Sequence, residues 1–320
     1  MLVPIVNSTV EGRLLAINWC VVCAAAALLV IVLAETDFVL RASDPIVIII
    51  AGLASTLAAL SFALLWQGSA RWPNVSHAAN VLSQLIAASM LIAPLTYIAA
   101  SLNYPLQDKN LFAIDQFMGL DWRSYLDKVD QYRLGNICNF GYRTFSWQPL
   151  LIPIFLCLSG KVARAYQFSL AFVLTVTVTV VISMFLPAAG AYTFLGLSPA
   201  DYPHLHPVDD FDHMRHLPLL REGKMRVLEI GQLTGIVTFP SFHAAGAILY
   251  LWALWAIRWM RAIALVCNVL LLLSTPIDGG HYFIDVVAGV SLAILSILAV
   301  RRLCCAFQHS LWRAAFPTLR

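Results

Sequence analysis

Charge is scarce in this chain of 320 residues. Asp, Glu, Lys and Arg make up only 12% of it, whereas about a quarter of an ordinary soluble domain is charged. Hydrophobic residues account for 60%, and the mean hydropathy is +0.80. The formal net charge of +3 is too small and too scattered for a nucleic-acid-binding protein. These features exclude a soluble domain and predict a polytopic membrane protein with one transmembrane domain over residues 1–320.

A disulfide framework is also lacking. The seven cysteines are an odd number, and most lie in apolar runs, where cysteine behaves as a small hydrophobic residue. Cys304 and Cys305 follow the last apolar run, where interfacial thiols and lipidated cysteines are the two interpretations. No cleavable signal pattern precedes the first apolar run, and no internal repeat is found. We expect no cofactor.

Apolar runs of bilayer length predict an all-α bundle of about eight transmembrane helices. The expected helices cover residues 14–34, 46–66, 79–101, 148–160, 165–187, 240–257, 262–276 and 282–300. The fourth and seventh are short for a full span. Two long loops, 102–147 and 188–238, interrupt the series.

Basic residues predict the orientation of this bundle. Arg and Lys beside short loops mark the cytoplasmic side of a membrane protein. Arg71, Arg164, Arg258 and Arg301 all fall on one side of the expected bundle. Both termini are therefore expected in the cytoplasm and both long loops outside. A multi-pass protein of a bacterial inner membrane agrees with this arrangement and with the lack of disulfides.

The first long loop has two interpretations. Its apolar residues are interleaved with Asp108, Asp115 and Asp121. This pattern is typical of a helix that lies in the headgroup layer, and equally of a solvated loop with a few aromatic anchors.

The second long loop contains two groups of polar residues. Residues 201–216 are rich in His and Asp, which can bind metal ions, but their spacing matches no recognised zinc pattern and exposed loops have similar compositions. Arg221, Lys224 and Arg226 follow. These cations are candidates for binding a phosphate group, or for facing anionic lipid headgroups.

Two segments place a histidine at an expected helix start. His281 and Asp285 are four positions apart, so the carboxylate can accept a hydrogen bond from one ring nitrogen and leave the other free. His243 follows Pro240 and Ser241, which suit a helix start whose free backbone N–H groups can bind an anion. The alternatives are a structural hydrogen bond for His281 and a polar interfacial residue for His243.

The predicted topology puts both histidines at the same face of the membrane, which makes phosphoryl transfer the leading chemistry. An imidazole oriented by a carboxylate is the better nucleophile, so His281 is expected to attack phosphorus and carry a transient phosphohistidine that Asp285 stabilises. His243 is expected to protonate the leaving oxygen and then deprotonate the acceptor.

These segments resemble two signatures of the type-2 phosphatidic acid phosphatase superfamily. Residues 239–243 are similar to its Pro-Ser-Gly-His motif, and Ser274 together with residues 281–285 is similar to its Ser-Arg-x5-His-x3-Asp motif. The resemblance implies a six-helix catalytic core over residues 140–302, the same roles for His243, His281 and Asp285, and no metal. Phe242 stands where the motif has Gly, and Thr275 where it has the phosphate-binding Arg.

The residues of both segments resemble the branch of inositol phosphorylceramide synthases and sphingomyelin synthases more closely than the ordinary phosphatases of the superfamily. That branch implies transfer of a phosphorylated headgroup from a membrane phospholipid or sphingolipid, with Arg221, Lys224 or Arg226 replacing the missing arginine. A lipid phosphate phosphatase, acting on phosphatidate or a polyprenyl diphosphate, is the alternative. Two alternatives belong to other functional classes: a non-catalytic membrane transporter or scaffold, and a metal-dependent hydrolase. The oligomeric state is left open.

Overall fold

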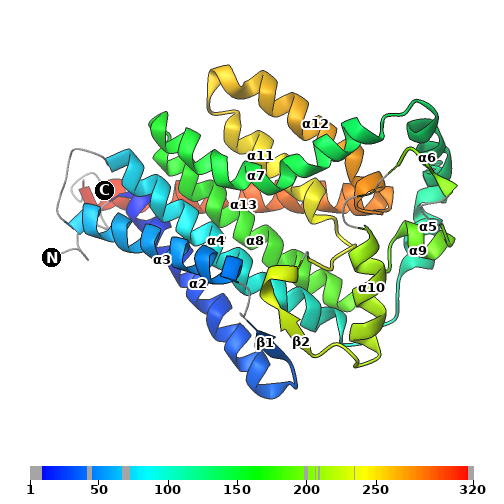
Figure 1. The fold of residues 1–320 in the computed structure, drawn as a ribbon. Coiled ribbons are helices and arrows are strands. Elements are labelled where there is room, and N and C mark those ends of the chain that lie inside the picture. The colour runs from blue at the N-terminus through cyan, green and yellow to red at the C-terminus, as the bar shows by residue number, and fades with distance from the viewer. Residues whose placement is uncertain are drawn as a thin grey trace.

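A computed structural model describes residues 9–41, 45–66, 73–197, 201–205, 207, 210–233 and 235–315, which are mostly helical (Figure 1). The long helices are α2 (Val10–Glu35), α3 (Pro45–Trp66), α4 (Pro73–Ala100), α7 (Gly135–Leu158), α8 (Val162–Phe185), α11 (Phe242–Leu254), α12 (Arg261–Asp278) and α13 (Phe283–Ala315). The short helices are α5 (Asp108–Phe117), α6 (Trp122–Gln131), α9 (Ala191–Leu195) and α10 (Asp210–Arg221), with 3-10 turns at Ile230–Gln232 and Arg258–Met260. The expected all-α polytopic bundle is confirmed.

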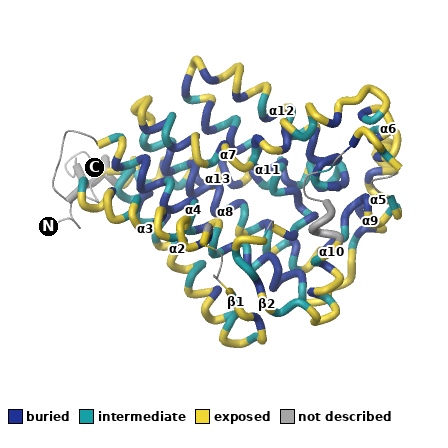
Figure 2. The backbone as a smooth tube through the Cα atoms, viewed as in Figure 1, coloured by how far each residue is buried: buried dark blue, intermediate teal, exposed yellow. Residues whose placement is uncertain are grey.

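Six segments of the described chain are long and apolar enough to cross a membrane, and they correspond to all or most of α2, α3, α4, α8, α12 and α13. Large apolar side chains are exposed on these helices, for example Ile48 and Ile49 on α3 and Val266 and Leu273 on α12. Figure 2 shows exposed stretches along α3 and α12. Such faces are favourable in the hydrocarbon core of a bilayer, where every backbone polar group is satisfied within its own helix. The chain is therefore an integral membrane protein.

The largest buried cluster lies between α2, α4, α7, α8, α11, α12 and α13, and its fully buried rings are Tyr166, Phe168 and Tyr250. Several polar side chains inside the bundle are paired with one another. The amide of Gln84 accepts a hydrogen bond from Asn18 and donates one to Asn80. Such bonds between helices satisfy groups that would be costly to leave unpaired in lipid.

The expected start of the fourth helix is wrong: α7 begins at Gly135 rather than at residue 148. Residues 135–147 are too polar to be recognised as part of a span. They are helical because they pack closely against α12: a Cβ at Gly141 would lie 2.9 Å from the carbonyl oxygen of Leu270. The predicted loop 102–147 thus contains α5, α6 and the first half of α7.

Helices α5, α6 and α9 form a cap at one end of the bundle, and the start of α2 and the end of α13 lie towards the other end (Figure 1). A second buried cluster joins the cap to the bundle through Leu111, Trp122, Tyr192, Ile277 and Tyr282. A pair of short parallel strands, β1 (Val39–Arg41) and β2 (Val227–Glu229), ties the end of α2 to the segment after α10, with Val39 opposite Val227.

Candidate active site

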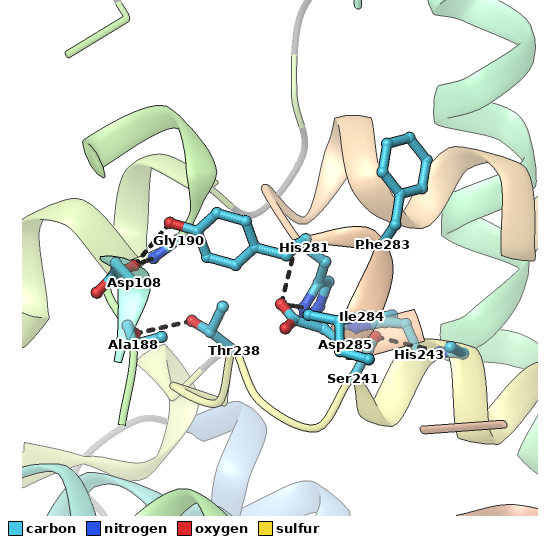
Figure 3. A network of polar contacts seen from close by, with 12 residues as sticks. Asp108, Ala188, Gly190, Thr238, Ser241, His243, His281, Phe283, Ile284 and Asp285 are labelled. Atoms are coloured by element: carbon cyan, nitrogen blue, oxygen red, sulfur yellow. Dashed lines mark hydrogen bonds and ion pairs between the residues drawn. The ribbon is translucent and has the colours of Figure 1, made fainter. Parts of the chain in front are cut away.

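The two histidine segments meet beside the cap. His243 lies in the first turn of α11, and His281 lies just before the first residue of α13. Their ring centroids are 6.2 Å apart, and the ring planes make an angle of 57° (Figure 3). The structure therefore brings together the two imidazoles that the sequence predicts to act together.

Asp285 lies behind His281, on the first turn of α13. Its Oδ2 is 3.4 Å from His281 Nδ1 and accepts a 2.9 Å hydrogen bond from the backbone N–H of Tyr282. The aspartate is fully buried, and His281 is 3% exposed. The carboxylate is thus placed to orient the imidazole and to stabilise positive charge on it.

Ser241 joins the start of α11 to the first turns of α13. Its Oγ accepts a hydrogen bond from the N–H of Ala244, and its own N–H donates to the carbonyl oxygen of Asp285. A Cβ built on Gly289 would lie 2.1 Å from the carbonyl oxygen of Ser241, so no larger residue fits between the helices. We therefore expect this crossing to set the separation of His243 from His281.

Helix α7 supplies two aromatic residues that hold His243. The ring of Tyr142 stacks on the imidazole with centroids 4.3 Å apart, and Phe145 packs at 4.1 Å. Tyr142 Oη and His243 Nδ1 form a 3.2 Å hydrogen bond, whose donor depends on the imidazole tautomer. A Cβ on Gly279 would lie 2.7 Å from the same hydroxyl and 2.8 Å from Cδ2 of His281, so Tyr142 reaches towards both histidines.

The cap fixes the start of α13 through Asp115. This buried carboxylate on α5 accepts hydrogen bonds of 2.8 and 2.9 Å from the backbone N–H groups of Phe283 and Ile284. Burial raises the pKa of the Asp115 carboxyl, and the two N–H bonds act in the opposite direction. A negative charge here is favourable because it satisfies free N–H groups at the positive end of the helix dipole.

Asp108, also on α5, holds the start of α9 and Tyr282 through hydrogen bonds to its carboxylate. Its carboxylate accepts hydrogen bonds from the N–H groups of Ala189 and Gly190 and from the hydroxyl of Tyr282 (Figure 3). Nearby, Trp122 Nε1 donates to the carbonyl oxygen of His281. The first loop is therefore not a solvated loop with aromatic anchors: Asp108, Asp115 and Trp122 are buried supports of the site.

An apolar cavity of about 270 Å³ opens from His243 into the bundle. Its wall includes Ile92 and Ala93 of α4, Phe172 and Val176 of α8, and Phe242. Phe242 replaces the glycine of the related motif, and its ring packs edge-on against Phe172 with centroids 5.2 Å apart. The cavity can hold hydrocarbon next to a titratable ring.

Two other predicted phosphate-binding residues, Ser241 and Ser274, have hydroxyls that already form hydrogen bonds within or at the start of a helix. Ser241 is buried at the start of α11, where its oxygen accepts the N–H of Ala244. Ser274 is buried in α12, where its hydroxyl donates to the carbonyl oxygen of Leu271. Both interactions stabilise helices, and a role of either hydroxyl in binding phosphate stays a prediction.

The three predicted cations have partners elsewhere. Lys224 pairs with Glu222 at 2.6 Å, Arg226 pairs with Asp37 at 3.7 Å, and Arg221 donates to the carbonyl oxygen of Tyr104. Within the described residues, none of the three is hydrogen-bonded or ion-paired to His243, His281 or Asp285. Their role as a replacement for the family arginine stays a prediction.

The His- and Asp-rich segment 201–216 lies partly outside the described residues, since His206, Val208 and Asp209 are not among them. Where the structure can be searched, no group of three or more His, Cys, Asp or Glu side chains could hold a metal ion. His216 is hydrogen-bonded to the hydroxyl of Tyr97, and the N–H of His204 donates to Asp130.

Comparison with known protein families shows which family this chain belongs to. A family profile described as the PAP2 superfamily matches residues 109–299, more than half of the chain. The chain belongs to the PAP2 superfamily. The PAP2 match includes both histidine segments and the capping helices α5 and α6. Searches of curated proteins and of solved structures gave no significant match.

Tyr142 is a site residue of this PAP2 protein that lies in a segment expected to be a loop, and no sequence pattern marks it. Replacing Tyr142 by Phe keeps the stacked ring and removes the hydrogen bond to His243. We expect turnover to fall by up to about tenfold, since one such bond contributes roughly 0.5–1.5 kcal/mol. Steady-state kinetics of the purified variant measures the loss, with Tyr132→Phe, at an exposed tyrosine, as the control. Unchanged turnover in Tyr142→Phe would remove the hydroxyl from the site.

Proposed function

We propose that this protein is a membrane lipid phosphotransferase that moves a phosphorylated headgroup from one lipid to a second alcohol, as inositol phosphorylceramide synthases do. The arrangement of His243, His281 and Asp285 beside an apolar cavity carries the proposal. Membership of the PAP2 superfamily supports a phosphatase-type or phosphotransferase-type enzyme at a coarser level.

In the first step, Nε2 of His281 attacks phosphorus and the bond between phosphorus and the oxygen of the donor lipid breaks. Asp285 stabilises the positive charge on the phosphorylated imidazole. Protonated His243 gives its proton to the leaving oxygen, so that a neutral lipid alcohol departs. Both rings can contact one phosphoryl group, because their centroids are only 6.2 Å apart.

In the second step, His243 removes the proton of the acceptor hydroxyl, which attacks phosphorus. The phosphorus–nitrogen bond breaks and His281 is regenerated. A lipid alcohol or cyclitol as acceptor makes the protein a transferase, and water makes it a lipid phosphate phosphatase. The apolar cavity next to His243 supports a hydrocarbon-bearing substrate.

The distribution of basic residues supports an active site on the extracytoplasmic face. His243 is at the start of α11, and Arg258 and Arg261 follow the end of that helix. His281 precedes α13, and Arg301 and Arg302 lie in its later part. Arginines next to short connections favour the cytoplasmic side, so the ends with the histidines face outwards.

The test follows a phosphorus label through the reaction. Purified protein is reconstituted in vesicles with a lipid labelled in the headgroup phosphate, together with candidate acceptor alcohols. We expect label in a new lipid and, after rapid quenching, on His281. Release of inorganic phosphate alone would replace the transferase by the phosphatase. Label in neither product and none on the protein would contradict both.

Metal removal is the companion measurement. A phosphohistidine mechanism needs no divalent cation, so we expect label transfer to continue at an unchanged rate in excess chelator. Loss of transfer that added Zn²⁺ or Mg²⁺ restores would support the metal-dependent hydrolase instead.

A further inference from the structure

A second polar site lies at the opposite end of α11 from His243. A groove of about 670 Å³ runs between the first turn of α8, the end of α11, the start of α12 and the later part of α13. Arg164, Arg261 and Arg301 line it, one from each of three helices. Trp252 in this groove follows His243 by more than two helical turns, a rise of roughly 13 Å, so the groove is separate from the candidate active site.

The arginines of the groove are held in place but not neutralised. The guanidinium of Arg164 lies over the ring of Trp252 at 4.2 Å, and its Nη1 is buried without a hydrogen-bond partner. Nε of Arg261 donates to the carbonyl oxygen of Trp255, and its guanidinium lies 5.4 Å from the centre of that ring. No described Asp or Glu lines the groove. Three like charges around one hollow, with a buried donor unused, are complementary to an anion.

The remaining wall of the groove is apolar. Ile248 and Leu251 of α11, Leu265 of α12 and Ile297 of α13 continue from the arginines along the bundle. Leu265 is exposed on the outer, membrane-facing surface of α12. A soluble anion would leave this apolar wall uncovered. A phospholipid would place its charged headgroup at the arginines and its hydrocarbon chains along the apolar wall.

The geometry points to a binding site for one anionic phospholipid of the cytoplasmic leaflet, with its phosphate among Arg164, Arg261 and Arg301 and an acyl chain along α11 and α13. Arginine suits this role because its planar guanidinium binds phosphate oxygens in pairs and stacks on indole rings. The site does not depend on the reaction at His281, because it lies at the other end of the helices.

Native mass spectrometry of the purified full-length protein tests the site. The probes are phosphatidylglycerol and phosphatidylcholine with the same acyl chains, and inorganic phosphate. We expect one phosphatidylglycerol per chain to be retained, at least about tenfold more tightly than phosphatidylcholine, with little competition from inorganic phosphate. Arg301→Gln and Arg164→Gln should each weaken this binding about tenfold, the scale of a lost charge-assisted pair.

Arg302→Gln is the matched control, since Arg302 is exposed next to Arg301 on α13 and does not line the groove. It should bind phosphatidylglycerol as the wild type does. Equal weakening in Arg302→Gln would show a diffuse electrostatic effect and overturn the site. So would equal retention of the two lipids, or displacement by inorganic phosphate at the lipid's own concentration. If Arg164→Gln fails to fold, Arg301→Gln decides, because Arg301 is exposed.

Discussion

We expect the replacement of His281 by Ala to lower the turnover of the reconstituted protein by about a thousandfold or more. His281 is the only candidate nucleophile of the proposed mechanism, and it is buried against Asp285 and held through its backbone by Trp122. Removing the imidazole removes the covalent intermediate, and with it the division of one displacement into two easier steps. Steady-state turnover of labelled lipid in vesicles measures the loss, and quenched samples show no phosphorylated protein.

Three further variants sharpen this result. Asp285→Asn keeps the shape behind His281 and removes the charge, so we expect a loss of about a hundredfold with substrate binding retained. Combining His281→Ala with His243→Ala should cost hardly more than His281→Ala alone, since the two act as a unit. His309→Ala, at an exposed histidine late in α13, should have wild-type activity. Turnover above about a tenth of wild type in His281→Ala, a loss on the scale of a single hydrogen bond, would contradict the role of His281 as the nucleophile.

Replacing Gly289 by Ala is expected to move His243 away from His281 without changing either residue. The new methyl group would lie 2.1 Å from the carbonyl oxygen of Ser241 and 3.3 Å from the Cβ of Ala244, so α11 has to move away from α13. A displacement of the order of 1 Å at reacting groups can cost about a hundredfold in rate. We expect that loss of turnover, with a destabilisation of about 1–3 kcal/mol from overpacking.

Gly52→Ala on α3 is the control for this change. A Cβ at Gly52 meets nothing within 4 Å, and the position is helical, so the variant should be as active and at least as stable as the wild type. Thermal unfolding in detergent and turnover in vesicles are measured for both variants. Full activity in Gly289→Ala would show that the crossing of α11 and α13 does not set the distance between His243 and His281.

The transmembrane helices are the part of the fold that the sequence predicts best. In a bilayer, a segment that lacks water must satisfy its backbone internally, so long apolar runs have few alternatives to a helix. The ranges 165–187 and 282–300 correspond to α8 and to the first part of α13. Helix ends are predicted less well, since α13 continues to Ala315 beyond Arg301 and Arg302.

Tertiary contacts decide the segments between the apolar runs. Residues 135–147 are helical because Gly141 lets α7 pack against Leu270, and that contact is not visible in the local sequence. In the sequence, Asp108 and Asp115 resemble the polar face of an interfacial helix. In the structure both are buried and accept hydrogen bonds from the N–H groups of residues far along the chain. A carboxylate that caps a distant helix has no local pattern, because its partner is fixed only by the fold.

The basic residues 221–226 show that closeness in the sequence does not imply closeness in the fold. Lys224 and Arg226 precede His243 closely in the sequence, which favours them as phosphate ligands. In the structure the strand pair and Phe38 hold Arg226, and Glu222 holds Lys224. Conversely, Arg164, Arg261 and Arg301 are far apart in the sequence and line one groove.

The sequence alone determined that this chain is a helical membrane protein, and its motifs singled out His243, His281 and Asp285. Hydrophobic runs and short chemical motifs are local, so they can be read without the fold. Only the tertiary structure decided that the rings lie 6.2 Å apart, that Tyr142 and the cap hold them, and that an apolar cavity opens beside them. These features depend on contacts between distant segments, which packing of the helices alone creates.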